Sequence, residues 1–487
     1  MIKLYTLNIK ETIEHLKKKD FTALELMESH IQAMEQSKNL NAFITNNYEA
    51  SIDAAKVADN RIKDGSARVL EGIPLAIKDN FCTKDILTTA ASKMLYNFVP
   101  TYESTVTSKL WAEGAILTGK TNMDEFAMGS SGLTSHYGPT KNPWKALGSD
   151  KDLVPGGSSS GSAAAVAAYL SMGALGTDTG GSIRQPASYC GVVGMKPSYG
   201  RCSRYGMISF ASSLDQAGVY ARTVDDCALL LTHIMGHDAK DSTSVNIALP
   251  DITNLNVRDL KGIKVGIPKE YNVEGLDNEI SALWNKGAEW LKEQGAEIID
   301  ISLSHTKYAL PVYYILAPAE ASSNLSRYDG VRFGLRETGK TLDEMYELTR
   351  KNGFGKEVKR RIMIGTYVLS AGFYDAYYRK AQKVRSLVAH DFWNSFSKVD
   401  VILAPTAPST AFPLDIKITN PVTMYLNDVF TIPASLAGLP CISVPAGLSK
   451  NRLPLGLQLI GNNYDELTVL KVAKALENAA DFKGYKG

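Results

Sequence analysis

Residues 154–197, VPGGSSSGSAAAVAAYLSMGALGTDTGGSIRQPASYCGVVGMKP, contain two serines, Ser158 and Ser182, that each follow a Gly-Gly pair. The Ala-rich apolar run between them predicts a buried helix followed by a strand, which a flexible Gly/Ser linker would not carry. Glycines beside a serine let the backbone approach a substrate closely and direct its N–H groups inward. Two such serines, brought together across one packed unit, indicate acyl-transfer chemistry.

The composition is that of a globular protein with a sizeable core. The chain has 487 residues, of which 44% are hydrophobic and 21% charged, enough for one large domain or several ordinary ones. Its 53 basic and 51 acidic residues nearly cancel. A chain that binds nucleic acid by itself usually has an excess of basic residues, so direct RNA binding is not expected to be its main activity.

The cysteines and the apolar runs predict a cellular compartment. Five cysteines are scattered with no Cys-x-x-Cys pair, which argues against disulfides and zinc and for a reducing environment. The first twenty residues lack the features of a signal or transit peptide. No apolar run reaches 18 residues. We therefore expect a soluble cytoplasmic protein without a metal site and without a membrane segment.

The hydrophobic pattern predicts one elaborated α/β domain over residues 1–487. The first 65 residues are predicted to be mainly helical, whereas residues 66–250 alternate short strands, helices and glycine turns. Residues 263–303 predict a further βαβ unit, and a tyrosine-rich helical insertion covers about 305–398. Because no linker interrupts the chain, we expect a central mixed, twisted sheet with helices on both faces.

One motif match indicates a nucleotide site that the context argues against. Residues 114–121, GAILTGKT, fit the phosphate-binding pattern G-x-x-x-x-G-K-[ST]. That loop follows a strand and is flexible between its two glycines. Here the AILT run itself predicts the strand, and a helix is predicted before Gly114. We therefore expect no nucleotide site there.

A second match indicates a serine hydrolase. Residues 157–161, GSSSG, fit the nucleophile-elbow pattern G-x-S-x-G, which would make Ser159 the nucleophile. The elbow follows a buried strand, but residues 148–155 read as a polar loop. The downstream histidines that could complete a triad read as surface or packing residues: His233, His237, His305 and His390. This alternative predicts acylation at Ser159.

Lys78 follows the apolar run GIPLAI at residues 72–77. A strand end could carry this lysine into a pocket or out to solvent, and its position leaves both interpretations open. Burial would lower its pKa so that the neutral amine accepts a proton. Ser–Lys pairs are a known variant of the nucleophile-and-base arrangement.

Three blocks, in order, resemble the amidase signature family. They are GIPLAIKD at 72–79, GGSSSGS at 156–162 and DTGGSIRQP at 178–186, and the resemblance extends over essentially the whole chain. Ser160 stands where the family usually has glycine. Because Gly161 is retained, we expect only a small local adjustment there.

The resemblance implies catalytic roles for three residues. Ser182 would be the acylated nucleophile, Ser158 a proton relay and Lys78 the base. The family also has a cis peptide before the relay serine, which here falls between Gly157 and Ser158. The implied oxyanion hole consists of backbone N–H groups in residues 179–182, namely those of Thr179, Gly180, Gly181 and Ser182.

Within the family, four further blocks resemble the glutaminase subunits of tRNA-dependent amidotransferases: residues 122–131, 320–330, 358–362 and 425–428. This similarity implies free glutamine as substrate, in a pocket formed partly by the helical insertion. The implied substrate-binding residues are Met128, Gly129, Ser131, Asp178, Tyr313, Arg361 and Asp428. A guanidinium can fork onto the α-carboxylate of glutamine, and a carboxylate can accept from its α-ammonium group.

The same similarity implies a heterotrimer in which this chain joins the B and C subunits of the amidotransferase. Ammonia from glutamine would pass to a partner that activates the carboxylate of misacylated Glu-tRNA(Gln) with ATP and Mg²⁺. Charged tRNA would be handled mainly by that partner, and this chain would hold no cofactor. Whether Asp-tRNA(Asn) is also a substrate is left open, as are the ammonia route and the surfaces that meet the partners. A free-standing amidase would use the same residues without partners, whereas a non-catalytic binding module would leave them unexplained.

Overall fold

The computed structural model describes residues 3–485 apart from 256, 258, 274 and 417–423. Its centre is an 11-stranded mixed sheet in the order β1-β3-β2-β4-β6-β5-β10-β11-β9-β7-β8. The strands are β1 Phe43–Asn46, β2 Pro74–Lys78, β3 Ile116–Thr121, β4 Gly173–Asp178, β5 Val193–Lys196, β6 Gln216–Ala221, β7 Lys264–Pro268, β8 Glu297–Ile301, β9 Val401–Pro405, β10 Cys441–Leu448 and β11 Pro454–Gly461.

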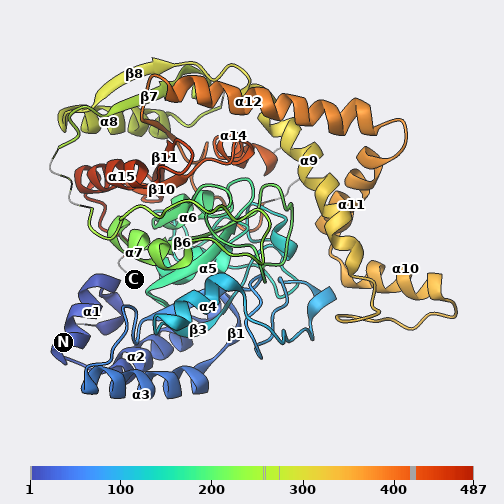
Figure 1. Cartoon of the computed structure of the whole chain (residues 1–487), viewed down its shortest axis with the longest axis horizontal. Helices are drawn as coiled ribbons and strands as arrows, with labels where there is room; N and C mark the ends of the chain where they lie inside the picture. Colours follow the sequence, from blue (N-terminus) through green and yellow to red (C-terminus); the bar gives the residue numbers. More distant parts are fainter. Residues whose placement is uncertain (1–2, 256, 258, 274, 417–423, 486–487) are drawn as a thin grey trace.

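Helices surround this sheet and extend from it (Figure 1). They are α1 Ile9–Lys18, α2 Ala23–Gln36, α3 Tyr48–Asp64, α4 Thr105–Ala112, α5 Ser160–Ala167, α6 Arg184–Cys190, α7 Val224–Ile234, α8 Asn278–Glu293, α9 Ala309–Asn324, α10 Leu342–Gly353, α11 Lys356–Leu369, α12 Lys380–Phe396, α14 Ile432–Leu436 and α15 Glu466–Ala480. The predicted α/β class, with helices on both faces of a mixed sheet, is confirmed.

Alternation along β2 shows the two faces of the sheet. Leu75 and Ile77 join the large apolar cluster that contains α7 and α15. Ala76 points the other way, into a smaller cluster with α5 and α6. Because both faces are covered, every residue of β2 is buried, including the lysine at its end.

The N-terminal segment contains a strand that the sequence analysis did not predict. Strand β1 lies between α2 and α3 and pairs antiparallel with β3. It is only four residues long, so its alternation is too short to detect against flanking helices. Its backbone also lies close to Gly119, where an added Cβ would come within 2.6 Å of Thr45 O.

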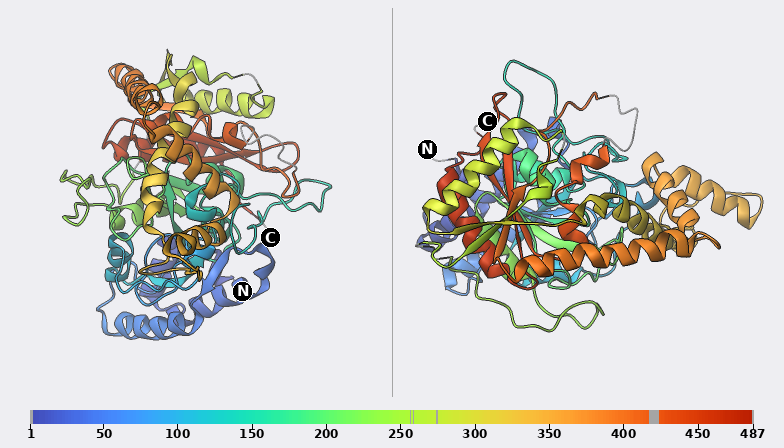
Figure 2. Two further views of the ribbon diagram at one scale, coloured as in Figure 1. Left: turned by 90° about the vertical axis from the view of Figure 1, so that its right-hand side faces the viewer. Right: turned by 90° about the horizontal axis from the view of Figure 1, so that it is seen from above.

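Two other regions of the chain have regular elements. Strands β7 and β8 are parallel with α8 between them, which is the expected βαβ unit. The insertion forms α9 to α12, and in Figure 2 (right) its helices α10 and α11 project away from the sheet. Helix α11 crosses α9 closely, since an added Cβ at Gly365 would lie 1.9 Å from Pro318 O.

The GKT segment matching the phosphate-loop pattern lies inside strand β3. Lys120 is fully buried there, 3.4 Å from the carboxylate of Asp79, and it donates to Phe81 O. The segment forms no loop that could surround a phosphate.

All five cysteines are buried and unpaired. Within the described part of the chain, no helix is long and apolar enough to cross a membrane. The same residues contain no group of three His, Cys, Asp or Glu side chains placed to hold a metal ion.

Candidate active site

Strand β2 ends at Lys78, deep inside the protein. Its Nζ donates hydrogen bonds of 2.8 Å each to Ser158 Oγ, Ser159 Oγ and Thr177 Oγ1. Burial lowers the pKa of Lys78 to about 7, although Asp124 and other nearby carboxylates oppose the shift. The amine can therefore be neutral near neutral pH, as a proton acceptor must be.

The turn before Ser158 is packed too tightly for any residue but glycine. An added Cβ at Gly157 would lie 2.0 Å from Asp124 Oδ2 and 2.7 Å from Ser131 N. The Gly157–Ser158 peptide is cis, as the family resemblance implies. Ser158 O accepts from Asp124 N at 3.1 Å, so the loop that follows β3 holds this turn in place.

Ser159 sits on the buried side of the same turn. Its Oγ donates to Thr177 O at 3.1 Å and accepts from Lys78, and the residue is fully buried. Since a loop rather than a buried strand leads to it, the geometry does not support Ser159 as an exposed nucleophile. Ser160, next along, is also buried, and its Oγ lies 3.3 Å from Thr140 Oγ1.

Ser182 lies in the segment between β4 and α6. It is 7% exposed, whereas Lys78 and Ser158 are fully buried. Ser159 N donates to Ser182 O at 3.2 Å, which holds the two serine turns side by side. No hydrogen bond between Ser158 Oγ and Ser182 Oγ is present among the described residues, so the relay between them stays a prediction.

The carbonyl groups of residues 180–182 each accept a hydrogen bond from within the protein. Gly180 O accepts from Thr431 Oγ1, Gly181 O from Gln185 N, and Ser182 O from Ser159 N. In a trans peptide the following N–H points the opposite way. The amides of residues 179–182 have no acceptor among the described residues, so they are available for a substrate oxygen, as the predicted oxyanion hole requires.

Arg361 on α11 is enclosed by aromatic rings. Its guanidinium carbon lies 5.4 Å from the ring centre of Phe210, 5.5 Å from that of Tyr314 and 5.8 Å from that of Tyr425. Arg361 Nε donates a hydrogen bond of 2.9 Å to Glu357 Oε1. The two terminal NH₂ groups find no acceptor within the described residues, so they can fork onto a carboxylate.

Three of the predicted substrate residues share one cavity. Gly129, Ser131 and Arg361 line a space of about 360 Å³, with Glu125 and Tyr425 among its other lining residues. Met128 is instead fully buried in the adjoining apolar cluster.

Tyr313 and Asp428 lie against the oxyanion segment. An added Cβ at Gly180 would be 2.7 Å from Tyr313 Cζ, and one at Gly181 would be 3.4 Å from Asp428 Oδ1. Burial raises the pKa of Asp428 to about 8, with Arg361 opposing the shift. An arriving ammonium group would favour the ionised form of this carboxylate.

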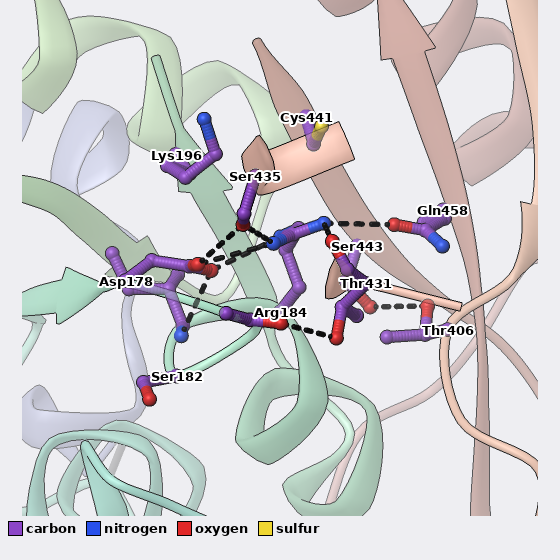
Figure 3. Close-up of polar contacts among 12 residues, drawn as sticks. Asp178, Ser182, Arg184, Lys196, Thr406, Thr431, Ser435, Cys441, Ser443 and Gln458 are labelled. Atoms are coloured by element: carbon purple, nitrogen blue, oxygen red, sulfur yellow. Dashed lines mark hydrogen bonds and ion pairs between the residues drawn. The ribbon is translucent and has the colours of Figure 1, made fainter. Parts of the chain in front are cut away.

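The carboxylate of Asp178 is paired with a neighbouring side chain. Its two oxygens accept from Arg184 Nε and Nη2 at 3.0 Å each, in a fully buried ion pair (Figure 3). Burial alone would raise the pKa of Asp178, but Arg184, Lys196 and the Ile183 amide together more than offset it, and the pKa is lowered. A direct contact of Asp178 with substrate stays a prediction.

Sequence reasoning missed several residues of the site. Thr177 reaches Lys78 because β4 lies parallel to β2 in this register. Glu125 binds Gly355 N at the start of α11, and Thr431 binds Gly180 O across 251 residues. The only local signal was the 122–131 block, which contains Glu125 together with the cavity-lining residues Gly129 and Ser131.

Comparison with known proteins identifies the family. The amidase family model matches residues 25–470. The A subunit of glutamyl-tRNA(Gln) amidotransferase from Parvibaculum lavamentivorans is 59% identical over 99% of this chain and 98% of the relative. The Paramagnetospirillum magneticum protein of the same name is 60% identical over 99% of both chains.

A solved structure agrees with these relatives. The Thermotoga maritima glutamyl-tRNA(Gln) amidotransferase A subunit is 39% identical with a TM-score of 0.79, covering 98% of this chain and 96% of that one. The chain therefore belongs to the amidase signature family, in which it is similar over its whole length to the A subunits of glutamyl-tRNA(Gln) amidotransferases.

Proposed function

We propose that this chain is the glutaminase subunit of a glutamyl-tRNA(Gln) amidotransferase. The observation that carries the proposal is a buried lysine with a pKa of about 7, hydrogen-bonded to Ser158, close to the amides around Ser182, which find no acceptor in the described part of the chain. The guanidinium of Arg361 and the carboxyl group of Asp428 supply groups that complement the two charges of free glutamine.

In the proposed reaction Ser182 Oγ attacks the side-chain amide carbon of glutamine. Lys78 takes the hydroxyl proton through Ser158, and the amides of residues 179–182 stabilise the developing oxyanion. The C–N bond then breaks, and the nitrogen leaves as ammonia with the proton returned by the relay. Water attacks the resulting glutamyl ester, releasing glutamate and restoring the Ser182 hydroxyl.

The helical insertion at about 305–398 supplies Tyr313 and Arg361, and we propose that it forms part of the glutamine pocket within one domain spanning 1–487. Ammonia would pass to the B subunit of the complex, and the C subunit would complete the heterotrimer. ATP and Mg²⁺ would act in the partner, which would also handle charged tRNA. A cytoplasmic location is consistent with the five buried free thiols.

The test is a Ser182→Ala variant in the complex with whatever subunits co-purify. Glutamine-dependent amidation of charged tRNA should disappear, while amidation with added ammonium salt should persist at the wild-type rate. The ammonium reaction serves as the control for folding and assembly. Retained glutamine-dependent amidation would refute the assignment of Ser182. A monomeric chain fully active on simple amides would favour a free-standing amidase instead.

A further inference from the structure

Thr431 lies where the C-terminal part of the chain contacts the oxyanion segment. It is fully buried between the 3₁₀ turn Leu426–Asp428 and helix α14. Its Oγ1 donates to Gly180 O at 2.7 Å. An added Cβ at Gly181 would lie only 2.2 Å from Thr431 Oγ1. The hydroxyl therefore packs directly on the Gly180–Gly181 peptide.

This contact controls the direction of a catalytic amide. In a trans peptide the C=O and the following N–H point in opposite directions, so fixing Gly180 O outward fixes Gly181 N inward. The carbonyl of Gly181 accepts from a backbone donor, Gln185 N, and that of Ser182 accepts from Ser159 N and from the Tyr220 hydroxyl. At Gly180 the donor is a side chain. Because glycine at both positions permits rotation of this peptide, the side chain is what keeps it oriented.

The position of Thr431 is itself fixed from two sides. Its own C=O accepts from Arg184 Nη1 at 3.0 Å, and Arg184 is paired with Asp178 at the base of the same segment (Figure 3). Asp428 O accepts from Thr431 N at 3.1 Å and also lies 3.2 Å from Thr431 Oγ1, whose shorter contact is the one with Gly180 O. The residue thus connects the oxyanion segment to the turn that carries Asp428.

We propose that Thr431 is a positioning residue that orients the Gly181 amide of the oxyanion hole. This inference rests on the proposed function, because it requires a tetrahedral intermediate formed at Ser182. An oxyanion binds more strongly to a pre-oriented donor than the uncharged substrate does. Loss of the hydroxyl therefore lowers kcat and leaves KM nearly unchanged.

The experiment compares glutamine hydrolysis by the full chain, with its co-purifying subunits, in Thr431→Val, Thr431→Ala and Thr431→Ser variants. Removal of one oxyanion donor costs about a hundredfold or more, so misorientation in the Val and Ala variants should lower kcat by about tenfold or more. KM should stay within about twofold, and the Ser variant should recover most of the activity. An aldehyde analogue of glutamine, which forms a tetrahedral adduct, should bind more weakly to the Val variant, while glutamate binds as before.

The matched control is Thr406→Val. Thr406 is also fully buried, and its Oγ1 lies 2.9 Å from Ser443 Oγ, away from Ser182 (Figure 3). It should keep the wild-type kcat. An unchanged kcat in both hydroxyl-free Thr431 variants, a raised KM alone, or equal loss of aldehyde and glutamate binding would overturn the inference. A Ser182→Ala enzyme that still hydrolyses glutamine would overturn the proposed function itself.

Discussion

Burial moves the pKa values of Lys78 and Asp428 close to neutral pH by opposite shifts, and it also raises the pKa of Glu125 in the cavity wall to about 7. It lowers the pKa of Lys78 to about 7 and raises the pKa of Asp428 to about 8. Both shifts follow from the cost of a charge in a poorly solvated interior. The site can thus hold an uncharged amine beside Ser158 and a protonated carboxyl group beside Gly181. Their pKa values predict how the reaction depends on pH.

The Lys78 amine should give the rising limb of the pH profile. Only the neutral amine accepts a proton, so kcat for glutamine hydrolysis, measured at saturating glutamine, should increase with pH through about 7 and then level off. Lys78→Arg keeps the charge at all these pH values and should lose about a hundredfold or more of activity. Stopped assays between about pH 5.5 and 9 would show this, and a flat wild-type profile would contradict it.

Asp428 should make glutamine binding pH-dependent. In the proposed complex the ionised form accepts from the α-ammonium group, so below about pH 8 the carboxyl group must release a proton before glutamine binds. KM should therefore rise as pH falls below about 8, and calorimetry in buffers of different ionisation enthalpy should detect proton release on binding. Asp428→Asn should raise KM by about tenfold or more near pH 8 and abolish this pH dependence. A pH-dependent KM in Asp428→Asn would assign the effect to another group.

At the scale of elements, α11 is positioned by a carboxylate outside the insertion. Glu125 accepts from Gly355 N, just before α11, at 3.1 and 2.8 Å, and from Ser92 Oγ at 2.5 Å. A carboxylate at a helix N-terminus also interacts favourably with the helix dipole. Since α11 carries Arg361, the loop after β3 and the helical insertion are placed together around one cavity.

Removing this carboxylate should loosen the insertion. Glu125→Ala leaves Gly355 N without its acceptor, at a cost of about 1–3 kcal/mol, and leaves Ser92 Oγ only the longer contact with Gly353 O at 3.3 Å. We expect a lower Tm and a raised KM for glutamine, because Arg361 loses its fixed position. Glu344, which accepts from Lys340 N just before α10, provides the control, and Glu344→Ala should leave KM unchanged. An unaltered KM in Glu125→Ala would show that the contact between Glu125 and Gly355 N does not affect glutamine binding.

The strands themselves were more predictable from the sequence than the order in which they pair. Apolar runs identified β2, β3, β4 and β7, because buried strands leave a local signal. Strand order leaves none: β5 pairs with β10, which follows it by about 250 residues. In the site, glycine-flanked Ser158 and Ser182 could be found by pattern. Thr431 and Glu125 could not, since their contacts depend on how distant segments pack.

At the scale of the whole molecule, the buried ion pair of Asp178 and Arg184 connects the segment between β4 and α6 to the C-terminal part of the sheet. Besides Asp178, Arg184 contacts Ser435 Oγ on α14 at 2.7 Å and Gln458 Oε1 on β11 at 3.2 Å (Figure 3). Gln458 Nε2 in turn donates to Phe430 O at 2.7 Å. The guanidinium thus contacts segments separated by more than 240 residues of sequence.

Loss of Arg184 should weaken this connection throughout the molecule. Arg184→Met leaves a buried carboxylate at Asp178 without its partner, which typically costs about 3–5 kcal/mol. Urea unfolding should show the loss, and adding Asp178→Asn should restore part of it. Arg379→Ala breaks an exposed ion pair with Asp375 and should leave the midpoint unchanged. An unchanged midpoint in Arg184→Met would show that the pair contributes nothing to stability.

The burial of all five cysteines has a practical consequence for following the helical insertion in solution. Burial raises the pKa of each thiol, so little reactive thiolate is available at neutral pH. A single cysteine introduced at exposed Met363 on α11 can therefore take a fluorophore or spin label without removal of the native thiols. The natural sequence is thus already a suitable background for measuring whether this helix moves when glutamine binds.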